Sequence, residues 1–121
     1  MDSPPASRPG PHAQAWVARD ALCVSPSYTR TYPLVVKRAS GLLVEDVDGY
    51  EYLDFTSGLG TALLGHCHPD VVNAIHAQAN AFVHMSGTDF YYPSQIRLAE
   101  QLAARCPGDE PKQVFFSNSG A

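Results

Sequence analysis

Short apolar stretches separated by turn residues dominate the chain between residues 34 and 55. The stretches LVVKR, GLLVED and YEYLDF are rich in β-branched and aromatic residues, and ASG and DVDG separate them. This alternation predicts a small antiparallel β-meander. The Asp48-Gly49 pair favours the second turn, because glycine accepts a positive φ and aspartate tolerates it. The neighbouring acids Glu45, Asp46 and Asp48 are expected at a solvated hairpin tip, not in a catalytic pair.

Two later segments have the period of an amphipathic helix. The first is PDVVNAIHAQANAFV, in which Pro69 suits a first helical turn. The second begins near Pro93 or Ser94, and Pro107-Gly108 ends it. AQAWVARDAL predicts a further short helix that carries Trp16, and KQVFF predicts a strand. The apolar positions of the two helical faces are Val72, Ile75, Ala79 and Phe82 in the first segment and Ile96, Ala99, Leu102, Ala103 and Cys106 in the second.

The order of these elements indicates an α/β protein. A small β-meander is followed by two helices, a strand and a loop of small residues, which is the order expected at the entry into a larger α/β domain. Residues 1–12 are rich in proline, serine and alanine. We expect them to form a mobile arm, because they carry little apolar surface to bury.

Charge and composition narrow the possible partners. The 121 residues have a formal net charge of -4 with only eight basic residues, so nucleic acid and anionic lipid are not expected partners. The start, MDSPPASRPGP, lacks an apolar stretch behind a basic head and does not resemble a secretory signal, so a cytoplasmic location is expected. The odd number of cysteines, three, without a CxxC pair favours reduced thiols over a disulfide framework or a structural zinc site.

The final stretch, SNSGA, follows the predicted strand with hydroxyl groups and unhindered backbone N–H groups. If a helix begins next, its first N–H groups and its dipole favour an anion at the same place. One interpretation is therefore a phosphate-binding loop. The other is a capped turn between strand and helix that binds no ligand, and these five residues alone favour this second interpretation.

A glycine-rich stretch, TSGLGTALLGHCHP, is too irregular for a strand or a helix. Its glycines allow the backbone to approach a ligand or another subunit, or they belong to an irregular connection packed on the core. His66, Cys67 and His68 suggest a metal site, but adjacent residues rarely point at one ion. A helix cap at His68 with a packed Cys67 is the better interpretation.

Aromatic residues cluster in HMSGTDFYYP, where Phe90, Tyr91 and Tyr92 stand near Gly87 and Asp89. Aromatic side chains with polar handles line pockets for small organic substrates, and they also fill cores and interfaces. Composition leaves both interpretations open.

Taken in order, these segments resemble the N-terminal part of class III pyridoxal-phosphate-dependent aminotransferases, the family of 4-aminobutyrate, acetylornithine and ornithine aminotransferases. The resemblance covers residues 25–121 and rests on YPLVV, DVDGYEYLDFTSGLG, LGHCHPDVVNAI, HMSGTDFYYPSQIRLAEQL and QVFFSNSGA. It implies the first quarter of a fold-type-I enzyme. Residues 1–24 would be an arm and short helix, residues 25–57 the β-meander of the small domain, and residues 58–121 the start of the large cofactor-binding domain, cut at its phosphate loop.

The same resemblance implies roles for individual residues. Ser119, Gly120 and Ala121 match the segment that holds the phosphate of pyridoxal 5'-phosphate. Leu59 and Gly60 match positions near the substrate, and Tyr91 matches one at its entrance. The family works on an amino acid and a 2-oxo acid as homodimers, and HMSGTDFYYP resembles the branch that acts on ω-amino acids such as 4-aminobutyrate.

The lysine that carries the cofactor in this family has no counterpart in these residues. Lys37 and Lys112 are the two lysines, and neither occupies the matching setting. We therefore expect no catalytic residue here and no turnover by the chain alone. Two alternatives stay open: an amino-acid racemase that uses the same cofactor, and a non-catalytic remnant that pairs with an intact homologue through residues 58–65.

Overall fold

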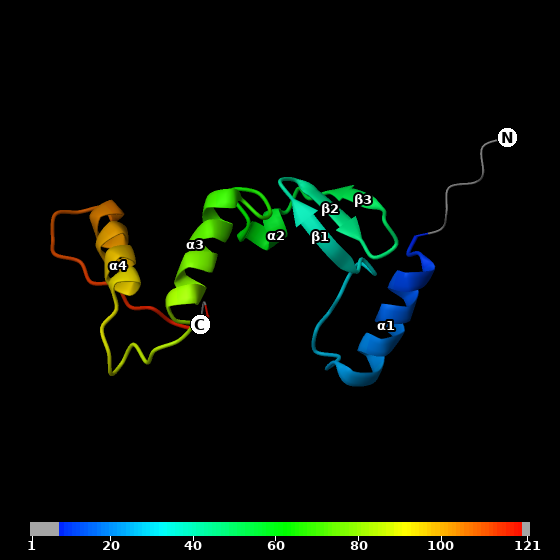
Figure 1. Cartoon of the computed structure of the whole chain (residues 1–121), viewed down its shortest axis with the longest axis horizontal. Helices are drawn as coiled ribbons and strands as arrows, with labels where there is room; N and C mark the ends of the chain where they lie inside the picture. Colours follow the sequence, from blue (N-terminus) through cyan, green and yellow to red (C-terminus); the bar gives the residue numbers. More distant parts are fainter. Residues whose placement is uncertain (1–7, 120–121) are drawn as a thin grey trace. The chain divides into compact units, whose positions relative to one another are not determined.

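The computed structural model describes residues 8–119 of the chain (Figure 1). It divides into two compact units, Met1–Ala77 and Gln78–Ala121. The first unit contains α1, the three strands, the short α2 and most of α3, and the second contains the end of α3 and α4. The predicted domain boundaries at residues 24 and 57 remain predictions.

A three-stranded antiparallel sheet forms the centre of the first unit and confirms the predicted meander. Its strands are β1 (Val36–Ser40), β2 (Leu43–Asp46) and β3 (Glu51–Leu53), in the order β1-β2-β3. Gly49 has a φ of +85° in the turn between β2 and β3, as the Asp48-Gly49 pair predicts.

Helix α1 (Pro11–Cys23) is attached to the sheet through Asp48. Gly10 precedes the helix and has no side chain to cap it, so the carboxylate of Asp48 accepts hydrogen bonds from the N–H groups of His12 at 2.9 Å and Ala13 at 2.8 Å. These N–H groups lack partners within the helix. The contact buries Ala13, which is 1% exposed.

The expected solvated hairpin tip is wrong for Asp46, which is 2% exposed. Its carboxylate turns inward and accepts hydrogen bonds from the N–H groups of Asp48 and Tyr50 and from the hydroxyl of Tyr52, at 2.9, 2.8 and 3.1 Å. Burial raises the pKa of Asp46, but these hydrogen bonds outweigh burial and hold that pKa below its usual value. The turn is therefore folded around a charged centre.

Glu45 also differs from the expectation, because it belongs to β2 and pairs across the sheet. Its carboxylate accepts hydrogen bonds from Arg38 Nε at 2.6 Å and Lys37 Nζ at 2.9 Å. The Arg38 hydrogen bond, followed by that of Lys37, lowers the pKa of Glu45. Both partners are on β1, so these ion pairs join neighbouring strands.

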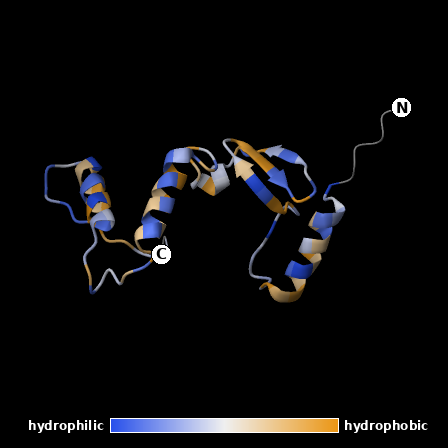
Figure 2. Cartoon of the chain, in the orientation of Figure 1, coloured by the Kyte–Doolittle hydropathy of each residue, from blue (hydrophilic) through white to orange (hydrophobic). Residues whose placement is uncertain are grey.

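Helices α3 (Pro69–Ala81) and α4 (Pro93–Arg105) have nearly the predicted bounds. They carry hydrophobic and hydrophilic residues in alternation along the ribbon (Figure 2). None of the helices in residues 8–119 has the length and hydrophobicity needed to span a bilayer.

The strand predicted for KQVFF is wrong: residues 111–117 have no regular secondary structure. A β-strand requires hydrogen bonds to a neighbouring strand. The described part of the second unit offers none, since its regular elements are helical.

Few apolar side chains are buried in either unit. Ala13 and Val44 are the buried apolar residues among those described. Large apolar side chains such as Ile75, Ile96 and Leu102 are between 41 and 60% exposed even though they lie on the apolar faces of α3 and α4. These faces therefore lack cover within their own units.

Candidate functional site

The predicted substrate residues Leu59 and Gly60 lie in α2 (Ser57–Gly60), a single turn with a left-handed backbone. Ser57, Gly58, Leu59 and Gly60 have φ values of +53°, +60°, +59° and +78°. Left-handed backbone costs a residue other than glycine about 1–2 kcal/mol. The sequence predicts only an irregular stretch here, whereas the structure has a defined and strained turn.

Asp54, which the sequence analysis did not identify as functional, holds this turn. Its carboxylate accepts hydrogen bonds from the N–H of Thr56 at 2.7 Å, from Thr56 Oγ1 at 2.6 Å and from the N–H of Gly58 at 2.9 Å. His66 Nε2 lies 2.7 Å from Asp54 Oδ2. An aspartate side chain often accepts a hydrogen bond from the backbone two residues later, which forms a turn. The aspartate two residues before Thr56 is therefore the sequence feature that could have indicated this turn.

The backbone of His66 pairs with the turn between β1 and β2. The N–H of Gly41 donates to the carbonyl of His66 at 2.9 Å, and the N–H of His66 donates to the carbonyl of Gly41 at 2.8 Å. Gly65 has a φ of +87°, and a side chain there would lie 3.1 Å from the Cα atom of Gly41. The loop and the sheet thus meet backbone to backbone.

His68 caps helix α3 as predicted, because its Nδ1 accepts a hydrogen bond from the N–H of Asp70 at 3.3 Å. The expected packing of Cys67 is wrong, since its side chain is exposed and its φ is +53°. Cys23 and Cys106 are also free and exposed. No three His, Cys, Asp or Glu side chains within residues 8–119 are grouped so that they could hold a metal ion.

The pKa of Asp54 lies well below its usual value. Hydrogen bonds from the Thr56 hydroxyl, His66 and the Thr56 N–H lower it, in that order, and outweigh burial. Unfolded aspartate has a pKa of about 3.9. A group whose pKa falls on folding stabilises the folded state above that value and loses this contribution as the pH drops towards the folded pKa.

We therefore expect the turn at residues 54–60 to loosen below about pH 4. A titration of the Gly58 amide resonance, with Asp54→Asn beside the wild type, measures this. The wild-type resonance should shift as the carboxylate protonates, and the variant should lack that shift. Asp109→Asn, which changes an acid in the loop after α4, is the control and should titrate like the wild type. A Gly58 resonance that shifts equally in Asp54→Asn would contradict the expectation.

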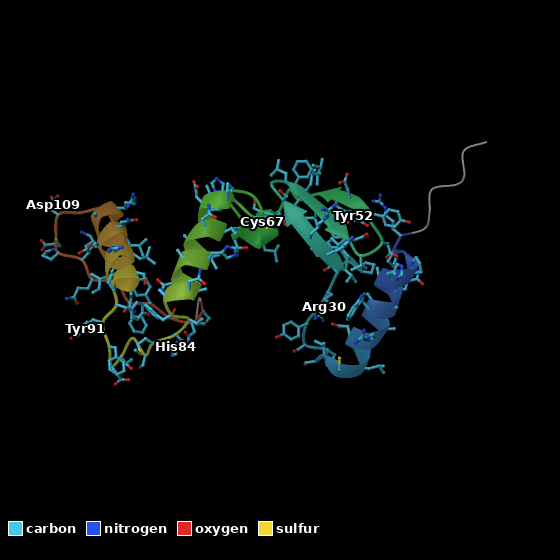
Figure 3. All side chains as sticks on the ribbon, viewed as in Figure 1. Arg30, Tyr52, Cys67, His84, Tyr91 and Asp109 are labelled. Atoms are coloured by element: carbon cyan, nitrogen blue, oxygen red, sulfur yellow. The ribbon has the colours of Figure 1, made fainter. Side chains whose placement is uncertain are left out.

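Tyr91 belongs to the second unit, in the loop before α4 (Figure 3). Its side chain is 95% exposed, and that of Phe90 is 53% exposed. Tyr92 packs edge-on against Phe82, with ring centroids 5.8 Å apart. Within this unit Tyr92 therefore packs against another aromatic side chain, as one of the two interpretations of the cluster expects, and Tyr91 does not.

The predicted phosphate loop is described only as far as Ser119. The hydroxyl of Ser117 donates to the carbonyl of Ser119 at 2.5 Å, and the chain bends at residues 118–119. Gly120 and Ala121 lie outside the described residues. The predicted site residues thus fall in both units, with Leu59 and Gly60 in the first and Tyr91 and Ser119 in the second.

A cavity of about 700 Å³, which the sequence analysis did not predict, lies between α1 and residues 24–36. Arg30 points into this part of the first unit (Figure 3) and pairs with Asp20 at 3.1 Å. Trp16 and Tyr28 also line it, each with an arginine over its ring. The predicted substrate residues of the same unit, Leu59 and Gly60, do not line this cavity.

Comparison with known proteins identifies the fold. The chain is similar to an ornithine δ-aminotransferase of Plasmodium falciparum, with a TM-score of 0.68 and 28% identity over 76% of this chain and 23% of that one. It is equally similar to a Toxoplasma gondii ornithine aminotransferase in which PLP partially occupies the active site, with a TM-score of 0.68, 28% identity and coverage of 76% and 21%. The chain thus has the α/β fold of aminotransferases.

Sequence comparison identifies the family. The family model "Aminotransferase class-III" matches residues 24–121. A 4-aminobutyrate aminotransferase of Mycobacterium tuberculosis is 40% identical over 113 residues, and an acetylornithine aminotransferase of Methanosarcina acetivorans is 42% identical over 105 residues. They cover 93% and 87% of this chain, which spans about a quarter of the length of each. The chain belongs to the class III aminotransferases, a family of enzymes that use pyridoxal 5'-phosphate.

Proposed function

We propose that this chain is the N-terminal part of an aminotransferase that moves an amino group from an amino acid to a 2-oxo acid. The match of residues 24–121 to the class III family is the observation that carries this proposal. We propose an ω-amino acid such as 4-aminobutyrate as the donor. Relatives named for 4-aminobutyrate and 5-aminovalerate, at 40% and 39% identity, support this choice.

Pyridoxal 5'-phosphate would be held at its phosphate by Ser119, Gly120 and Ala121. A serine hydroxyl donates a hydrogen bond to a phosphate oxygen, and small residues let backbone N–H groups approach the same anion. The donor types at this loop therefore fit a phosphate group. When bound, the cofactor supplies the electron sink for the reaction.

The lysine that binds the cofactor is expected outside residues 1–121. Lys37 donates to Glu45 at 2.9 Å, and Lys112 donates at 2.8 Å to the carbonyls of both Gly108 and Glu110. Both lysines therefore have structural partners, which supports the proposal that neither is catalytic. The chain alone is expected to have no activity.

Leu59 and Gly60 would contact the substrate, and Tyr91 would line its entrance. The exposure of Leu59 and Tyr91, 88% and 95%, leaves both side chains available for such contacts. We further propose that the enzyme is a homodimer, as the family resemblance implies, and that it is cytoplasmic.

An assay of the intact enzyme with pyridoxal 5'-phosphate, 4-aminobutyrate and a 2-oxo acid tests the proposed reaction. We expect the 2-oxo acid to be converted to its amino acid. Chiral analysis of a single amino acid, incubated with the enzyme and no 2-oxo acid, tests the racemase alternative. Racemisation without amino transfer would overturn the proposal.

Replacing Ser119 tests the phosphate contact in the same enzyme. Loss of one hydrogen bond to a charged group costs about 1.5–3 kcal/mol, so Ser119→Ala should weaken cofactor binding about 10- to 100-fold. Ser119→Thr keeps the hydroxyl and should bind nearly as the wild type does. An absorbance titration with pyridoxal 5'-phosphate measures both. Equal affinities of the alanine variant and the wild type for pyridoxal 5'-phosphate would show that the Ser119 hydroxyl does not bind the cofactor.

A further inference from the structure

The turn that carries Leu59 and Gly60 does not follow from local preference. Ser57 and Leu59 adopt left-handed backbone, which residues other than glycine avoid. The Leu59 side chain is 88% exposed, so packing within its unit does not compensate for this conformation. Strained backbone persists only where surrounding contacts hold it, and it is typical of functional sites.

Asp54 and His66, which precede and follow the turn in the sequence, hold it through hydrogen bonds. One carboxylate oxygen of Asp54 accepts both the N–H and the hydroxyl of Thr56, and the other accepts the N–H of Gly58. An ionised carboxylate only accepts hydrogen bonds, so His66 donates to it from Nε2 at 2.7 Å. The side chains are 11% and 24% exposed for Asp54 and His66, which shields this contact from water.

Both residues are anchored to the same β-hairpin. The N–H of Asp54 donates to the carbonyl of Leu42 at 2.9 Å, and His66 exchanges two backbone hydrogen bonds with Gly41. Gly41 and Leu42 connect β1 to β2. The sheet, the Asp54–His66 pair and the left-handed turn therefore form one connected framework.

We propose that Asp54 and His66 are positioning residues, which fix the left-handed turn so that Leu59 and Gly60 meet the substrate in a single conformation. This inference rests on the proposed function. Neither residue needs to contact the substrate itself. Their role is to remove the freedom of a turn that would otherwise relax, because a loop held in its bound conformation does not have to be ordered when the substrate binds.

The test compares His66→Leu with His66→Gln in the intact enzyme loaded with pyridoxal 5'-phosphate. Glutamine keeps an N–H donor near the position of Nε2, and leucine removes it. We expect His66→Leu to raise KM for the amino donor about tenfold with little change in kcat, since the contact with the substrate is uniform through the reaction. His66→Gln should restore most of the wild-type KM. Affinity for pyridoxal 5'-phosphate should stay unchanged in both, whereas general loss of structure would lower it.

His76→Leu is the matched control, because His76 is an exposed histidine on α3. Its KM should equal that of the wild type. If His66→Leu fails to fold, Thr56→Val tests the same contacts, since it removes the hydroxyl that donates to Asp54 and keeps the shape of the side chain. A wild-type KM in that variant, or equal KM values for His66→Leu and His66→Gln, would overturn the inference alone. An inactive wild-type enzyme would instead overturn the proposed function, and the inference with it.

Discussion

Gly65→Ala is expected to separate the glycine-rich loop from the sheet. The new Cβ atom would lie 3.1, 3.2 and 3.3 Å from the Cα, O and C atoms of Gly41, the residue whose backbone N–H and carbonyl pair with His66. Gly65 also has a φ of +87°, which alanine disfavours. The strained backbone and the steric overlap together should cost about 3 kcal/mol. Faster hydrogen exchange of the Gly41 and His66 amides measures the loss.

Gly41→Ala is the matched control for this prediction. Gly41 also has a positive φ, +57°, but no atom lies within 4 Å of its added Cβ. It should therefore carry only the backbone penalty, about 1–2 kcal/mol. If hydrogen exchange accelerates by the same factor in both variants, the close contact between Gly65 and Gly41 does not stabilise the attachment of the loop to the sheet.

Gly10→Ala is expected to detach helix α1 from the sheet. Its Cβ atom would overlap Cγ of Asp48 and lie 2.8 Å from Cβ of that residue, so Asp48 must move and give up the N–H groups of His12 and Ala13. Loss of such a cap and of the packing around Ala13 should cost about 2–3 kcal/mol. Trp16, the only tryptophan of the chain, lies on α1 and reports the change through its fluorescence.

A double-mutant cycle separates the steric overlap from other effects of Gly10→Ala. In the Asp48→Ala background the overlapping carboxylate is absent, so Gly10→Ala should cost far less there than in the wild type. Asp48→Ala alone should already loosen α1, because it removes the cap. If the free-energy costs of the two substitutions are strictly additive, overlap with the Asp48 side chain is not the reason why Gly10→Ala destabilises the protein.

Local sequence patterns predicted those elements that depend on neighbouring residues. The periods of α3 and α4 follow from apolar residues three or four positions apart, and the meander follows from short strands with turn residues between them. Pro69, Pro93 and Pro107 marked helix boundaries to within a residue or two. These signals do not depend on the rest of the fold.

Contacts between distant residues could not be predicted in this way. Asp46 and Asp48 resemble ordinary turn acids in the sequence, yet Asp46 is buried and Asp48 caps a helix 35 residues earlier. Asp54 and His66 are twelve residues apart and follow no period. KQVFF has strand propensity, but strand formation depends on a partner that propensity does not supply.

The handedness of the turn at Ser57–Gly60 limits which residues can occupy it. A run of four positive φ angles is the mirror image of an ordinary helical turn. The penalty at Leu59 is thus one of chirality, and replacing leucine by a smaller L-amino acid does not remove it. Glycine is the one achiral residue that does, and it would delete the side chain. Leu59 therefore carries a backbone cost that only the loss of its side chain would relieve.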